Sequence, residues 1–495
     1  MVVVKELILP EETIPTIVAI ELIVIICFLF CWLLKRDAIK GGILCSALVA
    51  YCFLYLPVLQ AIDSIWQFVC GNHVPSWIAL SIYILLGWIM LPLVNRVDWH
   101  FGKYKISFDY AVFNRVFNII TIILVAINVA PFVTYHYRQR ELAKHFNQKL
   151  EAPFSDLKLE AATTKPDIYY IILDGFADYQ TLKKLWGFDN HALVSYLQAQ
   201  GFYVVPEANS NYDRTEFSLG SSLNLQYINC VPDEMGKDWC DLSFFLRIIH
   251  NSVVAQLLKK NGYRFINISS APNEYLAIAD ENVRSDWFND FTVAVARFTP
   301  LYSTEDYVPL LRDMIAYHKL APGNALPEVC AKPGPKFVLF HTDVSHAPCL
   351  FDENGNKRPL PKGHFAIDWG TPKEYFAQWQ YTEKKAIGWI GEILGQPGAK
   401  PIVIIQSDHG PGIAFPNSIN SYYLERMHIL NAYYLPGHEK EGLYPTITPV
   451  NSFRVLLNDY FKTKLPLLPD RVYCAPDYAR PFHWSELRNL DQSIK

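Results

Sequence analysis

The chain has 495 residues, of which 51% are hydrophobic, and its mean hydropathy is +0.09. This balance is too apolar for an ordinary soluble protein and too polar for a protein made only of membrane spans. The formal net charge of −4 at pH 7 excludes the strongly basic surface typical of nucleic-acid-binding proteins. We therefore expect a membrane part and a soluble part, and no nucleic acid partner.

The apolar surplus is concentrated in the first third of the chain. Four segments of about 18–22 residues are apolar enough to cross roughly 30 Å of hydrocarbon. They cover residues 13–34, 41–62, 76–94 and 116–133. Lys and Arg gather between the first two segments and between the last two, which places those loops in the cytoplasm. We predict a transmembrane region with four helices over residues 1–134.

A linker over residues 135–165 follows the fourth segment. Its side chains Leu142, Phe146 and Leu150 recur at helical spacing among basic residues. This pattern predicts an amphipathic juxtamembrane helix that lies on a membrane surface, with its charges on lipid phosphates. The alternative is a solvated linker helix.

The remaining residues, 166–495, are enough for one large domain. Apolar runs typical of strands cover residues 168–173, 263–268, 337–340, 402–405 and 430–434. Helical patterns between them cover residues 195–200, 253–260 and 381–394. This alternation predicts an α/β domain with a mostly parallel sheet sandwiched by helices.

Cysteine spacing leaves two interpretations open for this domain. Cys230 with Cys240, and Cys330 with Cys349, are spaced to form disulfides if the domain lies outside the cytoplasm. The alternative is that all four are free thiols.

The first predicted strand ends in Asp174, which Gly175 follows. In open α/β sheets, ligands bind at the carboxyl ends of the strands, so Asp174 is a candidate ligand. The alternative is a local turn or cap, which is a common use of Asp before Gly.

Residues 211–224 are rich in hydroxyl groups and begin a predicted helix. Thr215 lies near the helix start, where free N–H groups and the helix dipole favour a phosphate. A hydroxyl that ligates a divalent ion loses its proton near neutral pH and can attack phosphorus. The alternative is Thr215 as an ordinary N-cap, and Ser218, Ser221 and Ser222 are rival nucleophiles.

The third group of polar residues follows the predicted strand 337–340. His341, Asp343 and His346 lie within six residues, just before Pro348. Two imidazoles at a strand end indicate contact with a metal or an anionic substrate, although a single His is more often structural.

The fourth group is Asp408 and His409, followed by Gly410 and Pro411 after the predicted strand 402–405. An acid and an imidazole on a tight loop suit a divalent ion such as zinc or manganese. The alternative is a simple turn. The four groups follow strand ends of one domain, in an order that allows them to converge on one crevice.

With these motifs the chain resembles the alkaline phosphatase/sulfatase superfamily, in particular its membrane-anchored sulfatase-like members related to lipoteichoic acid synthases and phosphoethanolamine transferases. The resemblance covers about residues 166–470 and rests on residues 408–410, residues 341–348 and Asp174. It implies an alkaline-phosphatase-like fold with a metal site and substrate contacts. Position by position, it implies metal ligands Asp174, Thr215, Asp408 and His409, the nucleophile Thr215, and substrate-binding residues His346, His341 and Asn211.

The resemblance also implies an activity and a location. The enzyme would move a phosphoglycerol-type or phosphoethanolamine-type group from a membrane phospholipid to an envelope glycan or glycolipid. It would lie in the bacterial cytoplasmic membrane, with residues 166–495 as an extracytoplasmic catalytic domain. One alternative is a hydrolase of phosphodiesters or phosphate esters, and another is a catalytically silent membrane scaffold.

Two departures from the family pattern limit these expectations. The chain has no C/S-x-P-S-R-like run, which argues against the formylglycine chemistry of sulfate-ester hydrolysis. Pro411 follows the Asp-His-Gly segment where phosphoethanolamine transferases continue towards a further His-Gly segment, and His428 is only a loose substitute. A complete second metal site is therefore not predicted.

Overall fold

The computed structural model describes most of the chain. The described residues are 10–71, 74–95, 99–101, 104–106, 110–160, 165–270, 278–283, 295, 299, 310–359, 369–414, 418–439, 441–477 and 479–487. The chain divides into two compact units. One contains Ile8–Arg138 with Asp286–Met314, and the other contains Gln139–Ser285 and Ile315–Lys495 with the first seven residues.

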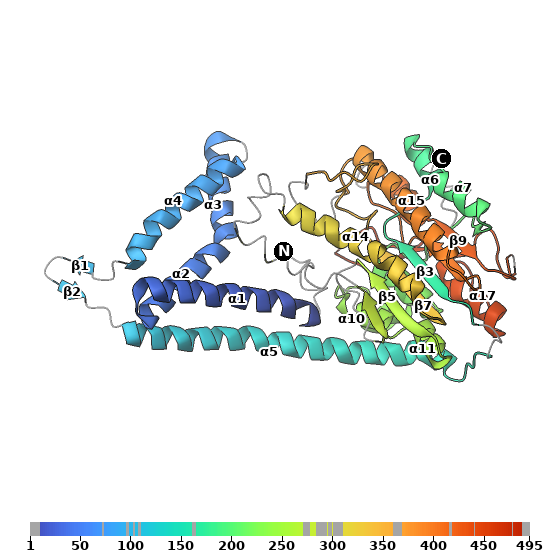
Figure 1. Ribbon diagram of the computed structural model, residues 1–495, viewed down its shortest axis with the longest axis horizontal. Coiled ribbons are helices and arrows are strands. Elements are labelled where there is room, and N and C mark those ends of the chain that lie inside the picture. The colour runs from blue at the N-terminus through green and yellow to red at the C-terminus, as the bar shows by residue number, and fades with distance from the viewer. Residues whose placement is uncertain are drawn as a thin grey trace. The chain divides into compact units, whose positions relative to one another are not determined.

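The first unit is a set of apolar helices (Figure 1). They are α1 (Pro10–Lys35), α2 (Ala38–Phe53), α3 (Tyr55–Cys70), α4 (Ser76–Asn95) and the first part of α5 (Tyr110–Glu151), with β1 (Trp99–Phe101) and β2 (Tyr104–Ile106) as an antiparallel pair. Among the described residues, length and composition qualify one helix as a membrane span, Ile17–Lys35 in α1. A second qualifies if the bent pair α2 and α3 counts as one span. The expectation of four continuous spans is corrected accordingly.

The second expected span, 41–62, is broken in its middle. Helix α2 ends at Phe53, and α3 continues at an angle of 48°. Pro57 lies in the first turn of α3. Proline has no N–H to donate, and its ring clashes with the carbonyl four residues earlier, so it tends to end or kink the preceding helix. The apolar composition of this segment was visible in the sequence, but the break was not assigned.

Helix α5 continues well past the expected fourth span. Its last part belongs to the second unit, and there the apolar stripe is buried, with Phe146 fully inaccessible and Leu150 nearly so. The ring of Phe146 stacks on Phe244 of helix α10 (Ser243–His250), with centroids 5.6 Å apart. The stripe is therefore covered by the protein itself, which corrects both the membrane-surface and the solvated-linker interpretation.

The second unit is built on a seven-stranded sheet with the order β4-β9-β8-β3-β7-β5-β6. Its strands are β3 (Ile168–Leu173), β4 (Tyr203–Val204), β5 (Arg264–Ser269), β6 (Glu281–Val283), β7 (Lys336–Thr342), β8 (Ile402–Gln406) and β9 (Asn431–Tyr434). The five strands from β8 to β6 pair in parallel, and β9 and β4 pair antiparallel at one edge. The predicted mostly parallel sheet is confirmed, and the run at 430–434 is its antiparallel strand.

Helices cover both faces of this sheet (Figure 1). The helix bounds are α6 (Tyr179–Trp186), α7 (Ala192–Ala199), α8 (Thr215–Ser222), α9 (Cys230–Met235), α11 (Val253–Lys260), α14 (Leu310–Ala331), α15 (Pro372–Leu394), α16 (Ile419–Met427) and α17 (Pro449–Phe461). Side chains of β3 alternate between the faces: Tyr169 and Leu173 belong to one apolar cluster with residues of α6, α7, α14 and α15, and Tyr170 belongs to another with residues of α8, α11 and α17. A central strand buried on both sides explains why β3 is apolar throughout.

Two smaller features complete the second unit. Strands β10 (Tyr473–Cys474) and β11 (Ser485–Glu486) form an antiparallel pair near the C-terminus. The unit's cysteines Cys230, Cys240, Cys330 and Cys349 are thiols rather than disulfides, so of the two interpretations of their spacing the structure has the thiol form.

Candidate metal centre

The candidate site lies where three neighbouring parallel strands end. Asp174 directly follows β3, the central strand, and Asp408 follows β8 by two residues. Residues of β7 and of the loop after it approach from the other side of β3. Polar groups that are far apart in the sequence meet here because the carboxyl ends of parallel strands share one edge of the sheet.

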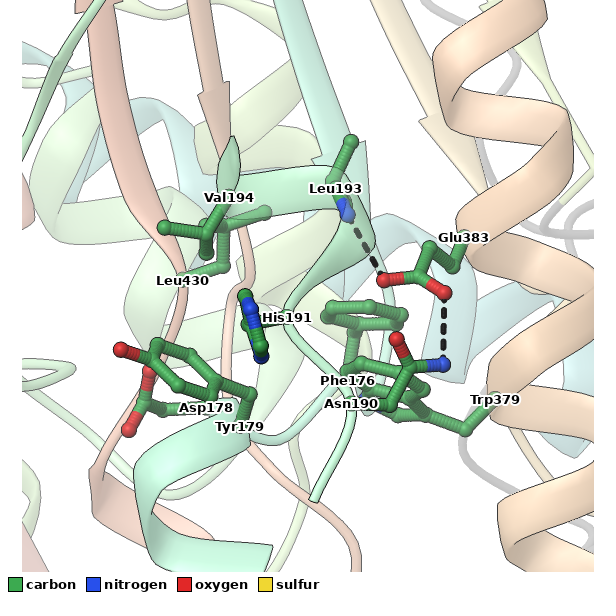
Figure 2. A pocket seen from close by; sticks show the side chains of 10 residues that line it. All are labelled: Phe176, Asp178, Tyr179, Asn190, His191, Leu193, Val194, Trp379, Glu383 and Leu430. Carbon is green, nitrogen blue, oxygen red and sulfur yellow. Dashed lines mark hydrogen bonds between the residues drawn. The ribbon is translucent and has the colours of Figure 1, made fainter. Parts of the chain in front are cut away.

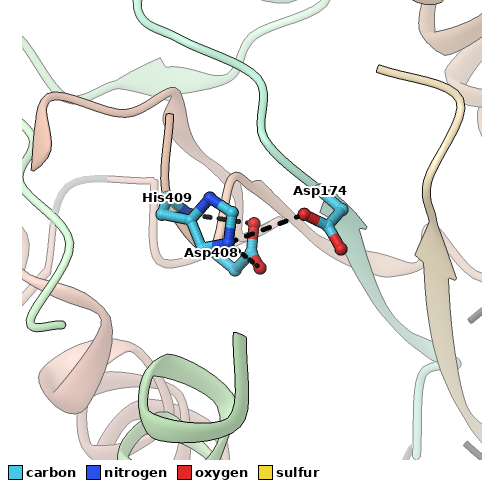
Figure 3. Close-up of side chains that lie close together, drawn as sticks. All are labelled: Asp174, Asp408 and His409. Carbon is cyan, nitrogen blue, oxygen red and sulfur yellow. Dashed lines mark hydrogen bonds and ion pairs between the residues drawn. The ribbon is translucent and has the colours of Figure 1, made fainter. Parts of the chain in front are cut away.

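Asp174, Asp408 and His409 form a compact group of possible metal ligands (Figure 3). One ligand atom from each residue lies within 4.8 Å of the others. His409 Nε2 is 3.7 Å from Asp174 Oδ1 and 3.4 Å from Asp408 Oδ2. All three side chains are buried. The structure therefore brings together three of the four predicted ligands in a site shielded from bulk solvent.

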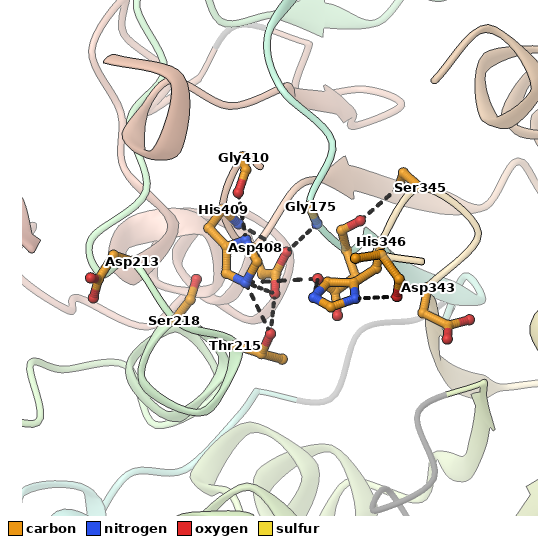
Figure 4. A network of polar contacts seen from close by, with 12 residues as sticks. Gly175, Asp213, Thr215, Ser218, Asp343, Ser345, His346, Asp408, His409 and Gly410 are labelled. Carbon is orange, nitrogen blue, oxygen red and sulfur yellow. Dashed lines mark hydrogen bonds and ion pairs between the residues drawn. The ribbon is translucent and has the colours of Figure 1, made fainter. Parts of the chain in front are cut away.

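Thr215, the fourth predicted ligand, completes this group (Figure 4). Its hydroxyl donates a hydrogen bond to Asp408 Oδ2 at 2.6 Å, and Oγ1 lies 3.2 Å from His409 Nε2. Thr215 is the first residue of α8, and Arg214 occupies the N-cap position. The Thr215 side chain therefore faces the carboxylate rather than capping the helix, which excludes the ordinary N-cap interpretation.

The rival hydroxyl groups lie inside the packed helix instead. Ser218 Oγ is 3.3 Å from Ser210 Oγ, and the hydroxyl groups of Ser221 and Ser222 donate to carbonyls three residues earlier in α8. All three rival serines are buried, whereas Thr215 is partly exposed. Among these hydroxyl groups, Thr215 is the one that combines exposure with contact to the acidic group.

The two predicted histidines of the third motif both face Asp174. His341, in β7, places Nε2 at 3.3 Å from Asp174 Oδ2 and is fully buried. His346, in the following loop, places Nε2 at 4.0 Å from Asp174 Oδ1, and its side chain is 27% exposed. His346 and Thr215 thus border the accessible side of the site, and His341 supports it from within.

The structure does not bring Asn211 into this group. Its amide nitrogen donates to the carbonyl of Arg471 at 2.9 Å, and its amide oxygen accepts from the N–H of Val450 at 2.8 Å. Val450 lies in the first turn of α17. The Asn211 side chain therefore joins three segments of the fold, beside the loop that leads to Thr215.

The electrostatics of the two carboxyl groups differ strongly. Burial alone would raise the pKa of Asp174, but three neighbouring imidazoles, led by that of His346, hold this pKa well below its usual range. Burial, and then the negative charge of Asp174, raise the pKa of Asp408 to about 7. Burial, and then the Arg426 charge, hold the pKa of His409 well below its usual value.

These groups fit a divalent cation. Two carboxylates packed together repel each other, and Asp174 Oδ1 is buried without a hydrogen-bond partner among the described residues. Carboxylate oxygens, an imidazole nitrogen and a hydroxyl oxygen are a donor set that zinc and manganese accept. Asp174, Asp408, His409 and Thr215 would hold the ion.

Several supporting contacts were not anticipated from the sequence. The N–H of Gly175 donates to Asp408 Oδ1 at 3.2 Å, and the hydroxyl of Ser345 donates to the carbonyl of Asp174 at 2.6 Å (Figure 4). The hydroxyl of Ser210 donates to the Asp408 carbonyl. Gly175 and Ser345 lie next to predicted site residues in the sequence, so their proximity to the site could be inferred from it. No sequence motif marks Ser210 as a neighbour of the site.

A small pocket elsewhere in this unit is separate from the candidate site (Figure 2). It lies between residues of α7, α15 and the segment after β3, and no predicted site residue lines it. Its buried carboxylate, Glu383, already accepts from Asn190 Nδ2 and the N–H of Leu193, both at 2.8 Å. The other lining acid, Asp178, accepts from the N–H groups of Gln180 and Thr181 at 2.9 and 3.2 Å, so both acids that line the pocket already have hydrogen-bond partners.

The sequence matches no protein-family model and no curated protein. Among solved structures, it matches the C-terminal periplasmic domain of EcEptC from Escherichia coli with 12% identity and a TM-score of 0.38, covering 61% of this chain and 85% of that chain. The integral membrane protein lipooligosaccharide phosphoethanolamine transferase A (EptA) from Neisseria meningitidis matches with 11% identity and a TM-score of 0.37, covering 86% and 88%. A protein in the alkaline phosphatase superfamily from Vibrio parahaemolyticus matches with 13% identity and a TM-score of 0.38, covering 66% and 80%. The superfamily that the motifs indicated is thus represented among the matched structures.

Proposed function

We propose that this chain is a membrane-bound, metal-dependent transferase that uses Thr215 as its nucleophile. It would move a phosphoglycerol-type or phosphoethanolamine-type group from a membrane phospholipid to an envelope glycan or glycolipid. In this proposal residues 1–134 form a membrane anchor, and residues 166–495 form the extracytoplasmic catalytic domain. The apolar helix α1 and the basic loops of the first unit support the anchor and its orientation.

One observation carries the proposal. The Thr215 hydroxyl is partly exposed, bonds to the Asp408 carboxylate at 2.6 Å and lies 3.2 Å from His409 Nε2. A nucleophile needs both a group that takes its proton and an open side from which the substrate arrives. Asp408 Oδ2, which already accepts the hydrogen bond of this hydroxyl, is placed to accept its proton.

The chain's own groups account for a two-step transfer. Thr215 Oγ1 gives its proton to Asp408 Oδ2 and forms a bond to phosphorus, while the bond from phosphorus to the lipid alcohol oxygen breaks and that oxygen takes up a proton from water. A hydroxyl of the acceptor then gives its proton to the hydroxide so formed and attacks the phosphothreonine. Thr215 Oγ1 recovers its proton from Asp408 as it leaves. A bound divalent ion would supply Lewis-acid stabilisation of the developing negative charge. His346, at the exposed border, is placed to contact the transferred group.

The two alternatives predict different products. A hydrolase would pass the same phosphothreonine to water, and a silent scaffold would form no phosphothreonine at all. The experiment incubates the full-length protein in detergent with vesicles that contain phosphatidylglycerol or phosphatidylethanolamine, with and without a glycan or glycolipid acceptor. Mass spectrometry then follows the headgroup on the acceptor, the free headgroup and the mass of the intact protein.

We expect Thr215→Ala to lower turnover by at least roughly 1,000-fold and to remove the covalent adduct, because the attacking oxygen is lost. The matched control is Ser221→Ala, because Ser221 carries a buried hydroxyl in the same helix that donates to the carbonyl of Ser218. It should leave turnover unchanged. Headgroup on the acceptor supports transfer, and free headgroup alone supports hydrolysis. Equal activity of Thr215→Ala and wild type would refute Thr215 as the nucleophile.

A further inference from the structure

Arg426 is a buried arginine near the end of helix α16. It bonds to both the carbonyl and the N–H of Gly410, in the loop that carries Asp408 and His409. Its Nη1 donates to the carbonyl of Gly410 at 2.7 Å, and its own carbonyl accepts from the N–H of Gly410 at 2.8 Å. Arg426 is only 3% exposed. Gly410 directly follows His409, so this pair of bonds sets the course of the loop immediately after a predicted metal ligand.

The Gly410 carbonyl also determines which nitrogen of His409 carries hydrogen. His409 Nδ1 lies 2.9 Å from this carbonyl oxygen, which can only accept a hydrogen bond. Nδ1 therefore carries the hydrogen, and in the neutral ring Nε2 keeps its lone pair. Nε2 is the atom that faces Asp174, Asp408 and the Thr215 hydroxyl. The same carbonyl thus accepts from both the imidazole and the guanidinium.

The other side of the Arg426 guanidinium holds the loop that carries the nucleophile. Its Nε donates to the carbonyl of Asp213 at 2.8 Å, two residues before Thr215. Asp213 is itself fixed, because its carboxylate accepts from the N–H of Ala475 at 2.9 Å. One planar side chain therefore joins the loop before Thr215 to the loop after His409.

We propose that Arg426 is the positioning residue that sets the distance between the nucleophile and the metal ligand His409, and fixes the ring of His409 with Nε2 towards the metal. The inference deepens the proposed function and rests on it. The described hydrogen bonds of the Arg426 guanidinium go to two backbone carbonyls, those of Asp213 and Gly410, so we assign it a positioning role rather than a ligand role. Partners of this kind orient ligating histidines, and their loss lowers metal affinity by about 10–100-fold in known sites.

The guanidinium suits this task for a geometric reason. Its donors lie in one plane and point in fixed directions, so two carbonyls on different loops are held at a set separation. A lysine at this position has a single ammonium on a flexible chain and would keep at most one of the two bonds well. The structure thus predicts that Zn²⁺ affinity is highest with arginine at position 426, lower with lysine and lowest with methionine.

The chain offers a matched control in Arg454. This arginine is also buried and also donates through Nε and Nη1 to two backbone carbonyls, those of Leu225 and Pro466, at 2.7 and 2.5 Å. Arg454 lies in α17 and contacts none of the predicted ligands through these bonds. Arg426→Met and Arg454→Met therefore each remove a buried guanidinium with two bonds to backbone carbonyls, and they differ in which loops those bonds hold.

The experiment measures Zn²⁺ affinity of full-length wild type, Arg426→Met, Arg426→Lys and Arg454→Met by competition with a chromophoric chelator, and the visible absorption of bound Co²⁺. We expect Arg426→Met to weaken Zn²⁺ binding about 10–100-fold and to change the Co²⁺ spectrum. Arg426→Lys should weaken Zn²⁺ binding less. The Zn²⁺ affinity of Arg454→Met should stay within about threefold of wild type. Melting curves show which variants fold. If Arg426→Met does not fold, the comparison of Arg426→Lys with wild type tests the proposal.

The outcomes separate this inference from the proposed function. If wild type binds no Zn²⁺ or Co²⁺, the metal-dependent function and the role of Arg426 are both overturned. If wild type binds metal and Asp408→Asn abolishes binding, but Arg426 and Arg454 variants change affinity equally or not at all, then only the role of Arg426 is overturned. A loss confined to the Arg426 variants supports it.

Discussion

The tightest backbone contact beside the candidate site is at Gly410, and Gly410→Ala tests it. A Cβ atom built on Gly410 would lie 1.9 Å from the carbonyl oxygen of Glu425 and 3.0 Å from its carbonyl carbon. Real Cβ atoms essentially never come within 3.0 Å of another heavy atom. The obstacle is helix backbone of α16 rather than a flexible side chain, so no rotamer change can relieve it. Either the loop or the end of the helix must move by about 1 Å or more.

The cost of this movement follows from the bonds that it breaks. Overpacking of this kind costs about 1–3 kcal/mol by itself. Separating Gly410 from α16 also stretches its two hydrogen bonds with Arg426, each worth about 1 kcal/mol. We expect a loss of about 3 kcal/mol or more, which corresponds to a fall in Tm of roughly 6 °C or more for a large domain.

The assay is thermal unfolding of the full-length protein in detergent, followed by the Zn²⁺ titration described above. Gly388→Ala is the control, because Gly388 is an exposed residue within α15 and its added Cβ would meet no atom within 4 Å. That change should raise stability by about 0.5–1 kcal/mol, since alanine favours helix more than glycine does. If Gly410→Ala melts within about 1 °C of wild type and binds Zn²⁺ equally well, the described approach of the loop to α16 is wrong.

Two further predictions concern pH and the long helix. Burial raises the pKa of Glu425 from 4.5 to about 7, although its carboxylate accepts from the N–H groups of Ile413 and Ala414. Because the pKa of Glu425 is higher in the folded state, its protonation stabilises the fold. This contribution, about 3 kcal/mol, is complete below pH 4.5 and is lost as the pH rises through 7. Glu425→Gln should therefore show a smaller fall in melting temperature between pH 5 and 8 than wild type. An equal fall in both proteins would contradict the raised pKa of Glu425. Phe146→Ala should destabilise the second unit by about 3–5 kcal/mol in denaturant unfolding, because the ring is fully buried on Phe244. A loss below about 1 kcal/mol would mean that the end of α5 does not pack there.

The sequence by itself determined the fold class and which polar residues follow the strand ends. A short β-branched run needs no partner to be recognised as a buried strand, and an acid followed by glycine at its end marks a loop whatever surrounds it. The grouping of Asp174, Asp408 and His409 as candidate ligands was therefore predictable. The parallel sheet followed from the alternation of strands and helices, and it predicted that these loops would meet at one edge.

Tertiary structure decided which of these groups lie together and what holds them. Thr215 stands out from Ser218 and Ser221 because its hydroxyl is partly exposed and reaches Asp408, 193 positions later in the chain. Arg426 bonds to Asp213 across a separation of 213 positions, and no local pattern marks it. The apolar stripe near Phe146 had the same spacing whether it met lipid, water or α10, and packing alone assigned it to α10. Periodicity and turn chemistry act between near neighbours in the chain, whereas these contacts depend on distances that only the folded chain sets.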